Sequence, residues 1–156
     1  MKKLFYLLFA LPLLAFMASC DDDDKDLPNV DITIDYSGAV EVDGVVTLAQ
    51  GEVLTINAIN VTSVNTKKKA ILGNVTYYID GEPVGTTGVA PYSAEVSTDG
   101  LDVGAHSLAF FAQVLEEGKA PGFAVFSFPF MLTAPGENPG EGSGTVTPEV
   151  RIQDHQ

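Results

Sequence analysis

The stretch NVTYYIDGEPVG, residues 74–85, contains the strongest local signal for the fold. Side chains two positions apart share a face of a β-strand, so Val75, Tyr77 and Ile79 are expected on one face. The pair Asp80-Gly81 follows, and it tolerates the positive φ angles that a two-residue hairpin turn requires. The stretch therefore predicts a strand, a tight turn and a returning strand.

Similar signals extend in both directions from this hairpin. Residues 29–36, NVDITIDY, alternate apolar and polar side chains, and Asp43-Gly44 marks a second hairpin between two β-rich pieces. Long β-rich runs occupy 52–64, 104–115 and 122–134, and no stretch after residue 19 shows a sustained helical period. About seven or eight short strands, with turns every 8–12 residues or so, predict an all-β fold, an antiparallel β-sandwich.

The segment from Val75 to Phe111 resembles bacterial immunoglobulin-like domains. The resemblance is carried by Val75–Gly81, Val84-Gly85, Pro91-Tyr92-Ser93 and Leu101–Leu108. It implies an immunoglobulin-like sandwich and says little about function. The chain has one cysteine and no tryptophan, so the core must hold by apolar packing alone. We expect the core to contain Val75, Tyr77, Ile79, Leu108, Phe110, Phe126, Phe128 and Phe130.

The first nineteen residues have the pattern of a secretory signal peptide. Lys2 and Lys3 precede an apolar run of about fifteen residues, which is shorter than the roughly twenty that span a bilayer. The run ends in Met17-Ala18-Ser19-Cys20, which resembles the lipobox of bacterial lipoproteins. That resemblance implies cleavage before Cys20 and lipid attachment to it. Several lipid chains would anchor the protein to a membrane essentially permanently.

Four aspartates, Asp21, Asp22, Asp23 and Asp24, follow the lipobox directly. A calcium loop needs ligands at alternating spacing and a glycine, so this run does not predict a metal site. It resembles the acidic export signal of Bacteroidota-type surface lipoproteins. The resemblance implies an outer-membrane protein exposed at the cell surface, and a lipoprotein that faces the periplasm is the alternative.

The chain divides by composition into four parts. They are the signal peptide 1–19, a lipidated acidic tether 20–28, the sandwich 29–133 and a Gly/Pro-rich flexible tail 134–156. An added strand over Thr145–Ile152 is the alternative for part of the tail, and Pro148 and the polar surroundings argue against it. The formal charge is −13, and loss of the signal peptide leaves six basic against 21 acidic residues, a charge of −15. Nucleic-acid binding needs clustered basic residues, so we expect no nucleic acid partner.

Residues able to perform catalysis are sparse. The chain has two histidines, and His106 at the start of a strand is expected to tie down a turn, while His155 lies in the tail. Glu116 and Glu117 are adjacent, so a strand would point them in opposite directions, and we expect them at a solvent-exposed hairpin. We predict no catalytic residue, no metal site and no cofactor, and hence no enzyme. A small extracytoplasmic hydrolase remains the alternative.

Three features are candidates for binding. The first is the basic run Lys67-Lys68-Lys69, and the second is a sugar-stacking surface formed by Tyr36, Tyr78 and Tyr92. The third is the last long strand, which is apolar on both faces, with Phe123, Val125 and Met131 on the face opposite the core. Such a strand is buried on both sides or shows one side to a partner.

Pro129 in that strand indicates a sheet edge or a bulge. The leading hypothesis is a non-catalytic binding or structural module that engages a protein partner or a surface glycan. A carbohydrate-binding accessory protein of a polysaccharide-uptake system is the alternative.

Overall fold

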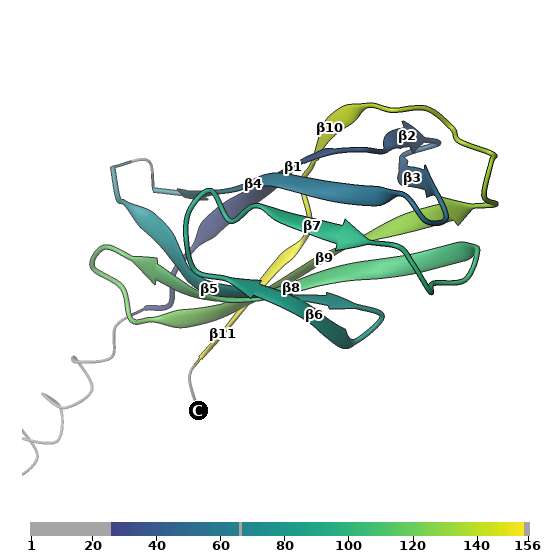
Figure 1. The fold of residues 1–156 in the computed structure, drawn as a ribbon. Coiled ribbons are helices and arrows are strands. Elements are labelled where there is room, and N and C mark those ends of the chain that lie inside the picture. The colour runs from purple at the N-terminus through teal and green to yellow at the C-terminus, as the bar shows by residue number, and fades with distance from the viewer. Residues whose placement is uncertain (1–25, 66, 155–156) are drawn as a thin grey trace, which may run out of the picture.

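The computed structural model describes residues 26–65 and 67–154, which form eleven β-strands and no helix. The strands make two sheets that pack face to face (Figure 1). This confirms the predicted all-β sandwich. The predicted signal peptide, Cys20 and Asp21–Asp24 lie outside the described residues. Within the described part of the chain, no helix is long and apolar enough to cross a membrane.

The smaller sheet has four antiparallel strands. Their order is β10 (Ser143–Val146), β1 (Val30–Ser37), β4 (Val53–Ser63) and β7 (Ala94–Ser97). In β1 the side chains of Val30, Ile32 and Ile34 are buried, as the alternation in the sequence predicts. Their polar neighbours face away from the second sheet because the side-chain period of a strand is two.

The larger sheet is built around three long strands. Its order is β2 (Val40–Val42), β3 (Val45–Ala49), β9 (Gly122–Thr133), β8 (Gly104–Glu116), β5 (Ala70–Ile79) and β6 (Glu82–Thr87), and β11 (Val150–Asp154) also pairs with β9. The pairing of β3 with β9 is parallel, and the other pairings are antiparallel.

Both predicted two-residue hairpins are present. Asp43 and Gly44 connect β2 to β3 with φ angles of 50° and 80°, and Asp80 and Gly81 connect β5 to β6 with 50° and 88°. Positive φ at both central positions is the condition for a type I′ turn, whose twist matches that of the flanking strands.

The core lies between the two sheets and contains all eight residues expected from the sequence. Phe110 is fully buried, and its ring stacks on Phe126 with a centroid separation of 5.0 Å. Tyr77 meets the same ring edge-on at 5.3 Å. Burial of an aromatic side chain of this size contributes roughly 1.5–3 kcal/mol, so this aromatic cluster is a major source of stability without a disulfide.

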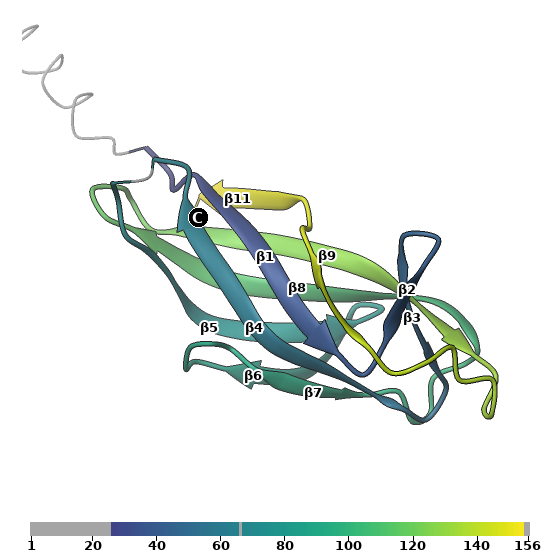
Figure 2. The same cartoon turned by 90° about the horizontal axis from the view of Figure 1, so that it is seen from above.

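The prediction of a flexible tail over residues 134–156 is wrong for two segments, which form strands. Residues 143–146 pair with β1 as strand β10, and residues 150–154 pair with β9 as strand β11. The chain therefore crosses from one sheet to the other between these strands, as Figure 2 shows in yellow. Pro148 lies in the crossing, so it interrupts neither strand. With these two strands the described residues form eleven strands, against the seven or eight expected from the sequence.

Strand β10 is held by a hydrogen bond as well as by its backbone. The Thr145 hydroxyl donates to Oδ1 of Asp35 at 2.7 Å, and the Asn60 amide donates to Oδ2 at 3.0 Å. These two donors lower the pKa of Asp35 below its usual value because they stabilise the charged carboxylate.

Strand β9 explains why Pro129 is tolerated. The pairing of β9 with β8 runs without a shift from Leu132 to Gly122, so the bulge alternative is wrong. On its other side β9 pairs with β11 up to Phe126 and with β3 from Phe130 onward. Pro129 lies in the gap between these two neighbours, where a missing N–H breaks no ladder.

Candidate binding face

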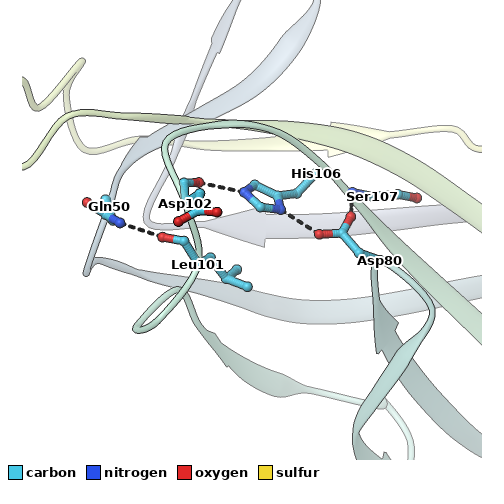
Figure 3. Close-up of polar contacts among 6 residues, drawn as sticks. All are labelled: Gln50, Asp80, Leu101, Asp102, His106 and Ser107. Atoms are coloured by element: carbon cyan, nitrogen blue, oxygen red, sulfur yellow. Dashed lines mark hydrogen bonds and ion pairs between the residues drawn. The ribbon is translucent and has the colours of Figure 1, made fainter.

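The histidine predicted to tie down a turn does so. Nδ1 of His106 lies 2.6 Å from Oδ2 of Asp80, in the β5–β6 turn, and Nε2 lies 2.6 Å from the Asp102 carbonyl oxygen (Figure 3). The other oxygen of Asp80 accepts the backbone N–H of Ser107 at 2.9 Å. Both ring nitrogens are thus occupied by the fold, which supports a structural role.

Electrostatics at this turn follows from the same contacts. The hydrogen bond to Asp80, and then that to the Asp102 carbonyl, raises the pKa of His106 above its usual value. The same bond to His106, and then the Ser107 N–H, lowers the pKa of Asp80. Each group therefore stabilises the charged form of the other.

Glu116 departs from the expectation of a solvent-exposed hairpin. Its side chain is 5% exposed, and its two oxygens accept the Ser63 hydroxyl at 2.5 Å and the Asn29 N–H at 3.3 Å. It points into the sandwich because it continues the inward side of β8, whereas Glu117 is exposed in the turn. Glu116 therefore ties β4 and the start of β1 to the end of β8. The two carboxyl groups do not form a pair.

A metal site is not evident in the described part of the chain, which contains no cluster of three or more His, Cys, Asp or Glu side chains able to hold an ion. His155 lies outside the described residues. The hydrogen-bond partners of His106 are the Asp80 carboxylate and the Asp102 carbonyl oxygen.

The lysine run lies at the end of the sandwich where residues 26–29 enter. Lys67, Lys68 and Lys69 are exposed in the β4–β5 connection. The Lys69 carbonyl accepts the Glu117 N–H at 2.9 Å, so this connection is joined to the β8–β9 turn. Lys119 in that turn pairs with Asp26 at 3.7 Å. Lys67, Lys68 and Lys69 therefore lie in a solvent-exposed connection next to the turn that contains Glu117.

The predicted sugar-stacking surface of tyrosines is wrong. Tyr36 and Tyr92 are 2% and 6% exposed, and the Tyr92 hydroxyl donates to the Leu72 carbonyl at 2.7 Å inside the molecule. Only Tyr78 faces outward, on β5. Tyr36 is buried because it continues the inward alternation of β1, and Tyr92 because its ring enters the core between the sheets.

The outer face of the larger sheet brings together the three residues predicted as a partner surface. Met131 is 36% exposed, and Phe123 and Val125 are half-buried on the same side of β9. Phe111 of β8 is their cross-strand neighbour, paired with Val125 and 38% exposed. We call this surface the outer face. The side chains that β5, β8 and β9 turn outward are all uncharged, and they are Ile71, Asn74, Thr76, Tyr78, Ala105, Ser107, Ala109, Phe111, Gln113, Leu115, Phe123, Val125, Ser127, Pro129, Met131 and Thr133.

The corresponding face of the smaller sheet has the opposite character. Asp31, Asp35 and Glu95 point outward there, among threonine, serine and asparagine side chains. A chain with 21 acidic residues therefore keeps carboxylates off one sheet face and accepts them on the other. The alternation of side chains would allow polar residues on the outward face of both sheets. The difference between the two faces therefore comes from which residues occupy the outward positions.

The two phenylalanines of the outer face stack on each other. The ring centroids of Phe111 and Phe123 are 5.3 Å apart and their planes differ by 8°. Adjacent strands lie about 4.8 Å apart, so rings this close and this parallel cover part of one another. The pair therefore forms an apolar ridge on the sheet, in which the two rings partly cover each other.

Sequence reasoning missed two residues of this site. Phe111 was visible as an outward position in the alternation of β8, next to the inward Phe110. Arg151 had no such signal, because the residues around it read as a flexible tail. In the structure Arg151 is exposed on β11 and pairs in register with Val125.

The chain matches no protein-family model, no curated protein and no solved structure among those searched.

Proposed function

We propose that this protein is a lipid-anchored, non-catalytic binding module at the cell surface, and that its outer face docks a partner protein. The observation that carries the proposal is the uncharged, aromatic outer face on a strongly acidic chain. Centres of protein interfaces are depleted in charged residues and enriched in aromatic ones. Extended apolar patches on a soluble domain mark interaction sites.

The size of the outer face suits a specific complex. Strands β8 and β9 contain 13 and 12 residues, which at about 3.3 Å each gives a length of roughly 40 Å. The neighbouring strands β5, β6 and β11 widen the face to roughly 20 Å at about 4.8 Å per strand. Because β5, β6 and β11 have only 10, 6 and 5 residues, the five strands together cover roughly 700 Å², which is close to one side of a standard protein interface.

The ring geometry favours a protein over a glycan. A sugar stacks on an open aromatic face, whereas Phe111 and Phe123 partly cover each other. A ridge of this kind fits an apolar groove in a protein, where aromatic side chains act as anchors. The burial of Tyr36 and Tyr92 removes the rings on which a carbohydrate-binding role rested.

The anchor and the fold type belong to the same proposal. The lipobox at Met17–Cys20 and the aspartates that follow support a mature chain attached through Cys20 to the outer membrane. The division of strands, with β1, β4 and β7 in one sheet and β5, β8 and β9 in the other, supports an immunoglobulin-like sandwich. Function still rests on the face, because this type of fold hosts many unrelated activities.

Site-specific photocrosslinking in intact cells tests the docking face. A benzophenone amino acid replaces Gln113, an outward residue that pairs with Phe123, in the full-length chain. A matched chain carries it at Asn57, an amide on the outside of the smaller sheet. We expect a discrete covalent adduct from position 113 and none from position 57. Absence of an adduct at 113, or equal adducts at both, contradicts the proposed face.

Mass spectrometry of the purified protein tests the anchor independently. The expected species begins at Cys20 and carries acyl chains, and Cys20→Ala abolishes the added mass. An uncleaved chain without lipid contradicts the anchor but leaves the docking face open.

A further inference from the structure

The arginine on β11 adds a charged group to the edge of the outer face. Arg151 pairs with Val125, which itself pairs with Phe111, so the three side chains form a row across β11, β9 and β8. Directly opposed side chains on neighbouring strands have Cβ atoms about 5 Å apart. Arg151 also lines a hollow of about 380 Å³ with Val125, Phe126, Ser127 and Glu149.

Arg151 is the only arginine in the chain, and it makes no ion pair within the described residues. This is notable because acidic residues outnumber basic ones by 21 to 8. Glu149 lines the same hollow, yet the two side chains are not within ion-pair distance. Among the described residues the guanidinium therefore has no charged partner, and its side chain is exposed to solvent.

We infer that the partner protein places an aspartate or glutamate carboxylate on Arg151 and an apolar side chain over Phe111 and Val125. The inference rests on the proposed function and specifies the partner's chemistry. A guanidinium offers a planar fork of donors that matches a carboxylate with two parallel hydrogen bonds. Arginine and aromatic side chains together are the usual composition of interface hot spots.

A single carboxylate fits the site better than a polyanion. Glu149 shares the hollow, and the chain carries a formal charge of −13, so a partner with many negative charges is repelled. The same charge disfavours a second copy of this chain as the partner. One carboxylate set in an apolar surface gains the contact with Arg151, and the apolar surroundings strengthen it by excluding water.

The crosslinking chain with the benzophenone at position 113 also tests this inference, in intact cells. We expect Arg151→Gln to lower the adduct yield about tenfold or more, and Arg151→Lys to give an intermediate yield because it keeps the charge and loses the fork. Glu149→Gln is the matched control in the same hollow and should leave the yield equal or higher. The urea midpoint of each variant shows whether the sandwich is intact, which we expect since both side chains are exposed.

Three outcomes separate the inference from the proposed function. An adduct whose yield is unchanged in Arg151→Gln overturns the inference and leaves the docking face in place. An adduct equal to two copies of this chain overturns the assignment of a different, carboxylate-bearing protein. A complete absence of adduct in every variant contradicts the docking face itself, and the inference fails with it.

Discussion

Nδ1 of His106 lies 2.6 Å from Oδ2 of Asp80, although the two residues are 26 positions apart in the chain. The contact joins the start of β8 to the turn that ends β5. His106 also stacks on Phe130 of β9 at 5.4 Å, so one imidazole connects a turn to two central strands. The ring therefore orders this end of the larger sheet.

The His106–Asp80 contact predicts a pH-dependent stability. The pKa of His106 is raised in the folded protein. Its stabilisation of the fold is therefore fully present below about pH 6.5 and is lost as the pH rises through the raised pKa. The pKa of Asp80 is lowered, so its contribution is present above about pH 3.8 and is lost as the pH falls through the lowered value. We expect Asp80→Asn to lower the free energy of unfolding by up to about 1 kcal/mol at pH 5.5 and by less at pH 9. Urea unfolding at both pH values measures this, and an equal loss at both would contradict it.

Neighbouring phenylalanines on β8 should respond very differently to truncation. Phe110 is fully buried and Phe111 is 38% exposed. We expect Phe110→Ala to lower the free energy of unfolding by about 3–5 kcal/mol because it leaves a cavity. Phe111→Ala should cost about 1 kcal/mol or less, through its lost stacking with Phe123. Denaturant unfolding of the two variants measures both losses of stability. Similar losses would contradict the prediction and show that the outer face is part of the core.

The hydrogen bond between Ser63 and Glu116 predicts that substitutions at these two residues have coupled effects on stability. Replacing it with alanine leaves the buried Ser63 hydroxyl without its acceptor. An unsatisfied buried polar group costs about 1–3 kcal/mol, and we expect Glu116→Ala to lose this amount. Ser63→Ala leaves one oxygen of the buried Glu116 without its donor and should cost a similar amount. The double variant should cost less than the sum of the two, because the residues share one interaction. Strict additivity in a double-mutant cycle would rule out the coupling.

A substitution at Gly144 tests how closely strand β10 packs against Tyr36 of β1. A methyl group at this position would come within 2.6 Å of the Tyr36 hydroxyl oxygen. Gly144→Ala should therefore displace β10 or Tyr36 and lower stability by about 1–3 kcal/mol. Gly85→Ala on β6 is the control, because nothing lies within 4 Å of its added methyl group. Thermal unfolding of the two variants measures the difference, and an unperturbed Gly144→Ala protein would mean that β10 is loosely attached.

The fold was predictable from the sequence where side-chain alternation and turn chemistry agree. Val30, Ile32 and Ile34 alternate with polar residues, and Asp43-Gly44 permits only a narrow set of turns. The tail gave no such agreement. Its glycine and proline content is typical of a linker, and its few apolar side chains are recruited because β1 and β9 offer strand edges that no local pattern reveals.

The candidate site was predictable in part. Phe123, Val125 and Met131 were assigned to one face by alternation, and the structure places them there. The solvent-exposed position expected for Glu116 was wrong because a short-range pattern does not show that Ser63 and Asn29 approach it from the opposite sheet. Arg151 was missed for the same reason, since its partner Val125 lies on a strand 26 positions earlier in the chain.

The pairing of β1 with β10 has a consequence for biogenesis. The Thr145–Asp35 hydrogen bond joins residues 110 positions apart, and both sheets receive a strand from residues 143–154. A nascent polypeptide still lacking those residues cannot complete either layer. Contacts of such long sequence separation also slow folding. Both layers should therefore become complete only after residues 143–154 have been synthesised, so the earlier part of the chain waits for them without its two closing strands.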